Sequence, residues 1–136
     1  MSIEYKDIAK IIFNRIPGSE ERYREYASTW GDSLSEVLVY VLVENIIGEM
    51  TREVCDASDQ ETRDRFRAVL RCFSDLIEFG DEDTRDLVEI GFRPHLEFVV
   101  NSYPECKQYL PQSLATLLSM NLDYRVSADD IRKKRH

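Results

Sequence analysis

The sequence predicts an all-α protein, and three of its features favour that fold class. Apolar residues between Gln60 and Val100 recur with the i, i+3, i+4, i+7 spacing that places them on one side of an α-helix. Capping residues and helix breakers divide the chain into helix-sized segments. Only five Gly and four Pro are present, too few for the many turns of a β-sandwich. We expect a single domain over residues 1–136, with about seven or eight antiparallel helices in an irregular bundle or in HEAT-like stacked hairpins.

The N-terminal part is predicted to contain three helices. Ser2 is expected to cap the first, which ends at the turn around Pro17, and Ser19 begins the second. Asp32 or Ser33 is expected to cap the third. The third segment is rich in β-branched residues, so a buried strand is the alternative; its length and its caps favour a helix.

A long helix is predicted to begin at Gln60, after a polar connection over residues 51–59. Ser58 or Asp59 is its expected cap. Gly80 is expected to end it in the left-handed conformation that glycine adopts easily. Its apolar stripe is expected to face the core and consists of Phe66, Val69, Leu70, Phe73, Leu76 and Ile77.

A second helix of this hairpin is predicted to start at one of the acids Asp81, Glu82 and Asp83. Pro94 lies inside its pattern, so a kink or break is expected near residues 91–93. Its apolar residues occupy two flanks, which predicts neighbours on both sides. They are Leu87, Val88, Ile90, Gly91, Phe92, Leu96 and Val99.

Three short helices are predicted to complete the chain. Prolines at 104 and 111 bracket the first, and Gln112 to Leu122 form an amphipathic second. Ser127 is expected to cap a last helix over residues 128–134.

The formal net charge is −8, which disfavours binding to nucleic-acid phosphates and favours basic partners. The basic run at residues 132–135 is interpreted as a solvated helix end, so we expect no nucleic-acid and no membrane partner. No apolar run approaches the roughly 20 residues that cross a bilayer, and no signal peptide is apparent. The widely spaced Cys55, Cys72 and Cys106 indicate reduced thiols in a cytoplasm.

Residues typical of catalysis are scarce. Of the two histidines, His136 is the last residue, and His95 is interpreted as a half-buried packing or hydrogen-bonding group. No phosphate-binding glycine motif and no calcium-loop pattern occurs. We therefore expect no enzyme activity, no cofactor and no metal.

Acidic residues concentrate around the turn that joins the two long helices. Capping needs only one of these acids. The other acids of this turn, called the acidic corner below, either face solvent only or bind a basic partner. The partner-binding residues predicted here are Asp75, Glu78, Asp81, Glu82, Asp83, Asp86 and Glu89.

The hairpin resembles a family of small, acidic, all-helical bacterial proteins in which a Gly-Asp-Glu turn joins two helices. The similar residues are Glu78-Phe79-Gly80-Asp81-Glu82, Arg85-Asp86, Gly91-Phe92 and Leu96. Arg93-Pro94-His95 departs from the family pattern. Most of these proteins are uncharacterised, and many look like immunity proteins of polymorphic or contact-dependent growth-inhibition systems.

The resemblance implies an immunity protein that binds a cognate, basic toxin, often a nuclease, through the acidic corner. The alternative is a helical adaptor or scaffold module that binds a host-cell protein and inhibits nothing. The sequence leaves the oligomeric state open.

Overall fold

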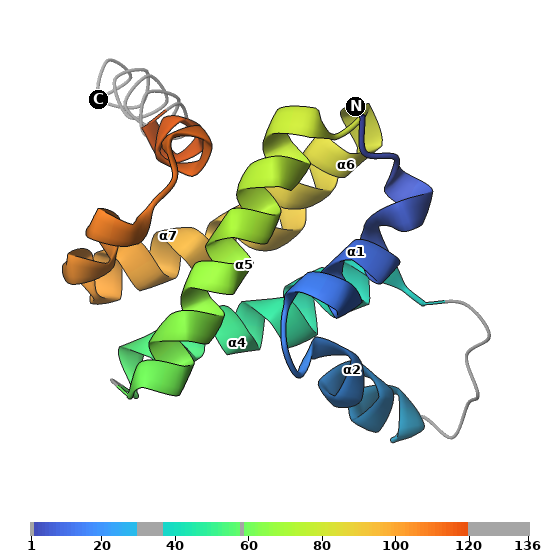
Figure 1. Cartoon of the computed structure of the whole chain (residues 1–136), viewed down its shortest axis with the longest axis horizontal. Coiled ribbons are helices and arrows are strands. Elements are labelled where there is room, and N and C mark those ends of the chain that lie inside the picture. The colour runs from blue at the N-terminus through green and yellow to red at the C-terminus, as the bar shows by residue number, and fades with distance from the viewer. Residues whose placement is uncertain (1, 30–36, 58, 120–136) are drawn as a thin grey trace, which may run out of the picture.

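The protein is helical wherever it has regular structure in the computed structural model, which describes residues 2–29, 37–57 and 59–119 (Figure 1). The first half begins with a 3₁₀ turn (Tyr5–Asp7), α1 (Ile8–Arg15) and α2 (Ser19–Ser28). One continuous helix follows, made of α3 (Val39–Val41), the π turn η2 (Leu42–Ile47), α4 (Gly48–Arg52) and the 3₁₀ turn η3 (Glu53–Cys55). The second half contains α5 (Gln60–Phe79), a continuous helix made of α6 (Glu82–Leu87), η4 (Val88–Phe92) and α7 (Arg93–Ser102), the 3₁₀ helix η5 (Pro104–Tyr109) and a helix over 112–119. These described residues confirm the all-α prediction.

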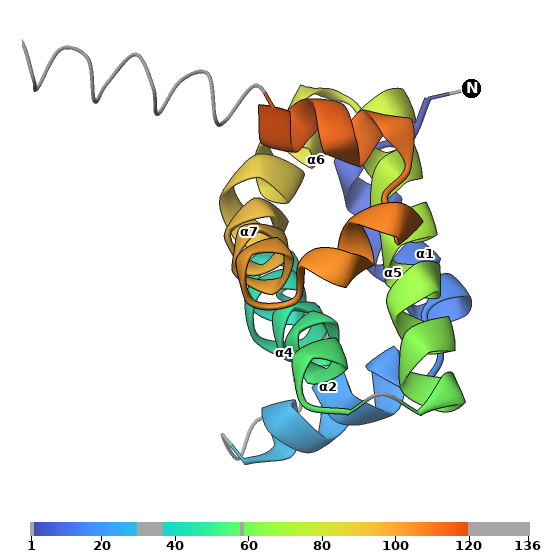
Figure 2. The ribbon, with the colours of Figure 1, turned by 90° about the vertical axis from the view of Figure 1, so that its left-hand side faces the viewer.

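The long helices form two layers. Figure 2 shows α1 and α5 on one side and α4, α6 and α7 on the other. A hydrophobic cluster of described residues fills the space between them, and the rings of Phe73 and Phe92 stack across it with centroids 4.0 Å apart. Leu114, Leu117 and Leu118 cover one end of this cluster. None of the described helices is long and apolar enough to cross a membrane.

The N-terminus differs from the prediction. The first helical turn begins at Tyr5, and Ser2 caps nothing, because Ile3 instead forms a parallel β-bridge with Gly80. The backbone N–H of Ile3 donates to Phe79 O over 2.7 Å, and that of Asp81 donates to Ile3 O over 2.9 Å. Two long-range hydrogen bonds therefore fasten the N-terminus to the acidic turn.

The turn between α1 and α2 and the start of α5 agree with the sequence. Gly18 takes the only positive φ among the described residues, 84°, and the Ser19 hydroxyl donates to Ile16 O over 2.8 Å. Asp59 caps α5 by accepting from the N–H of Thr62 over 3.1 Å. The alternative cap Ser58 lies outside the described residues.

The third segment is helical, as expected, but its helix starts at Val39 and not directly after the predicted caps, because the backbone of Leu38 is extended. The caps predicted at 32 and 33 lie outside the described residues. The polar connection predicted over residues 51–59 is wrong at its start, because the helix continues to Cys55. Thr51 and Val54 are buried, and the Thr51 hydroxyl donates to Ile47 O over 2.6 Å. Burial on the inner face thus extends the helix past the point where polarity predicts a loop.

Gly80 does not take the predicted left-handed conformation: its φ is −76° and its ψ is 154°. A Cβ on Gly80 would lie 2.2 Å from Leu76 O and 2.5 Å from Thr84 Cγ2. Glycine is therefore required here for space rather than for backbone freedom.

Pro94 does not break the helix, which runs without interruption to Ser102. Immediately before it the chain forms a π turn, Val88–Phe92, closed by a hydrogen bond from the N–H of Arg93 to Val88 O. This wider turn accommodates the missing N–H of the proline within a continuous helix. The predicted irregularity is at the right place, but its form is a π turn.

The C-terminal predictions are tested in part. The proline-bracketed segment is the 3₁₀ helix η5, and the next helix is present over 112–119. Leu122 and the helix predicted after Ser127 lie outside the described residues.

Candidate protein-binding surface

Two of the seven predicted acids are engaged by the fold itself. Asp75 forms an ion pair with Arg15, with 2.8 Å between Oδ2 and Nη1. Asp81 caps α6: its Oδ1 accepts from the Thr84 N–H over 2.9 Å and from the Thr84 hydroxyl over 2.6 Å. Its Oδ2 accepts from the N–H of Tyr5 over 3.1 Å. Asp81 therefore organises the corner by joining α6 to the N-terminal segment.

The Thr84 hydroxyl, the Thr84 N–H and the Tyr5 N–H hold the pKa of Asp81 below its ordinary value. The unfolded chain consequently takes up a proton before the folded chain does as the pH falls. The charged carboxylate stabilises the fold above about pH 4, the range of an unfolded Asp, and this contribution is lost as the pH falls through the folded-state pKa.

At pH 7 the Asp81→Asn variant is thus expected to be less stable than the natural protein. Near pH 2 the two proteins are expected to be equally stable. Urea unfolding midpoints between these pH values measure the difference. Asp86→Asn is the matched control, because Asp86 is exposed on the same helix and caps nothing. If the stability difference between Asp81→Asn and the natural protein stays constant with pH, the inferred coupling between folding and protonation of Asp81 is contradicted.

The other acids point outward. Glu78, Glu82, Asp83 and Asp86 are exposed, and Glu89 is half-buried. Their side chains form no hydrogen bond or ion pair with another described residue. By contrast, Glu53 accepts from both Arg22 and Arg65, at 2.8 and 2.9 Å. These five acids therefore present negative charge with which no described cation forms an ion pair.

Several apolar side chains on the two helices of the hairpin are exposed, and one of them, Ile90, was assigned wrongly from the sequence. Ile90 was placed on a buried flank, yet 60% of it is exposed. Phe79 and Phe98 are 49% and 45% exposed, and Pro94 is also exposed. Exposed apolar groups next to unpaired charge are typical of protein-binding surfaces.

His95 lies where the two helices with π turns cross closely. Its Nδ1 accepts from Arg52 Nε over 2.9 Å, and its ring fills the space in which a Gly48 side chain would lie. Burial, and next the Arg52 charge, lower the pKa of His95, so the ring is neutral at pH 7. A groove of about 510 Å³ beside it is lined mainly by acids and by these two side chains.

The thiols are poor nucleophiles. Burial raises the pKa of Cys72 to about 12 and that of Cys106 to about 11, so both are protonated at neutral pH. All three cysteines are free. Within the described residues no group of three or more His, Cys, Asp or Glu side chains is placed to hold a metal ion.

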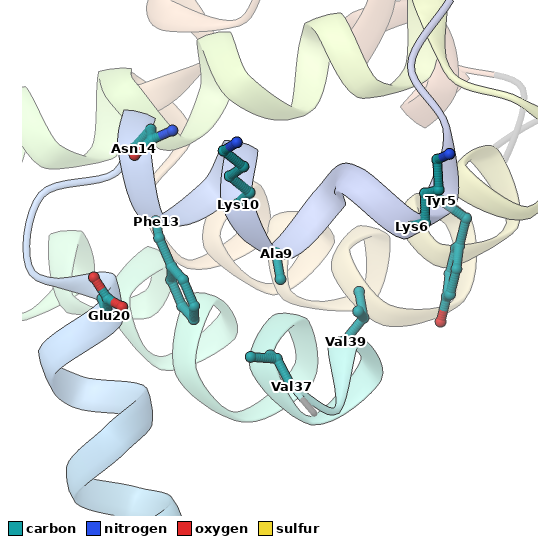
Figure 3. Close-up of a pocket in the computed structure, with 9 residues that line it drawn as sticks. All are labelled: Tyr5, Lys6, Ala9, Lys10, Phe13, Asn14, Glu20, Val37 and Val39. Carbon is teal, nitrogen blue, oxygen red and sulfur yellow. The ribbon is translucent and has the colours of Figure 1, made fainter. Parts of the chain in front are cut away.

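A second hollow, of about 610 Å³, lies between α1 and the start of the third helix (Figure 3). Phe13 and Ala9 point into it toward Val37 and Val39, while Lys10 lies on the outer side of α1. This lining suits an apolar contact and contains no pairing of a nucleophile with a base.

A sequence model of one family, described as a domain of unknown function (DUF7674), matches residues 9–124. The matched range includes the acidic corner and both π turns. No curated protein and no solved structure matches the chain.

Proposed function

We propose that the chain, which belongs to the DUF7674 family of domains of unknown function, acts as an immunity protein that binds a basic toxin and blocks it. The acidic corner is the contact surface. Its central contacts are Glu78, Glu82, Asp83 and Asp86, with Glu89 at the edge and with Asp75 and Asp81 holding the corner in shape.

The observation that carries this proposal is the outward display of charge. The four exposed acids lie on adjoining ends of two helices, and no described cation pairs with them. Their Coulomb field extends into solvent, where it attracts a positively charged surface and accelerates encounter. The exposed Phe79 and Ile90 provide apolar area that a partner can bury.

Inhibition follows if the toxin is a nuclease with a basic cleft. An acidic corner seated over such a cleft takes the place of substrate phosphates and excludes them. The interaction is expected to weaken as salt rises, because exposed charges are screened over about 10 Å at 0.1 M.

Charge reversal tests the proposal. In the quadruple variant with lysine at Glu78, Glu82, Asp83 and Asp86, affinity for the toxin encoded immediately upstream is expected to fall at least about 100-fold, because each contact turns repulsive. Titration calorimetry measures the affinity, and toxin activity with added protein measures inhibition.

The matched control carries the same charge change on other exposed acids. These are Glu21, Glu25, Glu49 and Glu105. Equal losses in the two variants would show that net charge alone matters and would overturn the assigned surface. Tight binding without inhibition would favour the adaptor function instead.

A further inference from the structure

The helix from Glu82 to Ser102 displays a straight stripe of exposed residues at intervals of four. In a regular α-helix each step of four residues drifts by about 40°, so four steps would carry the stripe about 160° around the axis. Such a stripe would leave the surface and enter the core. Its members are Glu82, Asp86, Ile90, Pro94 and Phe98.

The π turn Val88–Phe92 straightens the stripe. Its hydrogen bond from Arg93 to Val88 spans five residues, which adds one residue to the turn. Residues after it are set back by about 100°, so Phe98 lies only about 60° around the axis from Glu82. The accessibility of all five side chains agrees with this geometry, with 60% exposure at Ile90 and 45% at Phe98.

The acidic side chains of the stripe lie at one end of it. Its N-terminal half carries Glu82 and Asp86 beside exposed Asp83. At its C-terminal end the Arg52 guanidinium lies over the Phe98 ring, 4.1 Å from the centroid. Between these ends Ile90 and Pro94 present apolar surface, so the stripe has a direction as well as a shape.

We propose that this stripe docks one amphipathic helix of the partner. The apolar face of that helix lies on Ile90, Pro94 and Phe98, and its lysines or arginines cluster at the end that meets Glu82 and Asp86. A helix laid along a straight apolar stripe is a common mode of peptide recognition. Charge complementarity selects a basic helix and sets its direction. The inference deepens the proposed function, since it names the element through which the basic partner binds.

The test uses a synthetic probe, so it does not depend on the toxin. The probe is a peptide of about 18 residues whose leucines repeat with helical spacing and whose remaining positions are mainly lysine. A second peptide of the same composition has its leucines spread around the helix. Calorimetry with the full chain is expected to detect 1:1 binding of the first peptide and at least tenfold weaker binding of the second.

Variants locate the site. Ile90→Ala, Phe98→Ala and the pair Glu82→Lys with Asp86→Lys are each expected to weaken peptide binding about tenfold or more. Leu38→Ala is the matched control, because Leu38 is 44% exposed just before α3, away from the stripe. Circular dichroism confirms that each variant is folded. Equal binding of the two peptides, or equal effects of Ile90→Ala and Leu38→Ala, overturns the inference.

A second copy of the chain is the competing occupant. If sedimentation shows a dimer that Ile90→Asp converts to a monomer, the stripe is a self-association surface and the inference is overturned. If the amphipathic peptide binds at the stripe but the toxin does not bind, the docking surface stands and the proposed function fails. If the toxin binds and stripe variants leave its affinity unchanged, the function stands and this inference fails.

Discussion

Phe73→Ala is expected to lower the free energy of unfolding by about 3–5 kcal/mol. Phe73 is fully buried on α5, and its ring stacks on fully buried Phe92 at an interplanar angle of 15°. Because Phe92 belongs to the opposite layer, the truncation removes a buried contact between the two layers and leaves a cavity between them. The loss is a large share of the roughly 5–15 kcal/mol by which domains are stable.

Urea unfolding with natural protein and variant measures the loss. Phe79→Ala provides the control on the same helix, because Phe79 is 49% exposed. Its effect is expected to remain near about 0.5 kcal/mol, the range of ordinary surface substitutions. Similar losses at the two positions would contradict the two-layer core as described.

The features that were predicted correctly are those with local causes. The apolar spacing of α5 follows from burial of one face, and Phe66, Val69 and Leu70 are indeed buried. Asp59 and Asp81 cap their helices through bonds to residues three positions away. Such causes act within a few residues, so the sequence alone reveals them.

The features that were missed depend on distant parts of the chain. Gly80 was assigned a left-handed φ because helices often end in that way, but the bridge to Ile3 fixes an extended conformation instead. Ile90 was assigned to the core because periodicity assumes a regular α-helix, and the π turn shifts the register at that residue. Pro94 was the one sequence signal of this register shift. A proline inside a helix lacks the backbone N–H, so the hydrogen bonding of the preceding turn has to change.

The candidate site shows the same division. The sequence alone located the acidic corner, because three consecutive acids stand at a helix start where only one is needed as a cap. It did not separate Asp75, which pairs with Arg15 from another helix, from freely exposed Glu82 and Asp86. That separation requires tertiary contacts.

Gly48→Ala is expected to destabilise the protein by about 1–3 kcal/mol, the range for overpacking a close contact. A Cβ at this position would lie 2.4 Å from Nε2 of His95. The ring has little freedom to move, since Arg52 holds its Nδ1 at 2.9 Å. The substitution therefore forces α7 away from α4 or expels the ring. Gly91→Ala is a milder control, because its Cβ would lie 3.2 Å from Val43 Cγ1.

A double-mutant cycle separates this steric cause from a general loss of glycine. His95→Ala removes the obstacle together with the Arg52 hydrogen bond, so Gly48→Ala is expected to cost less in the His95→Ala background than in the natural protein. The expected coupling is about 0.5–3 kcal/mol, measured by urea unfolding of all four proteins. Strictly additive losses would contradict the contact.

His95 adjoins Pro94 of the exposed stripe, so displacement of α7 also alters the docking surface. The Gly48→Ala variant is therefore expected to bind the amphipathic peptide more weakly than the natural protein does. The double variant Gly48→Ala with His95→Ala is expected to regain part of the lost affinity.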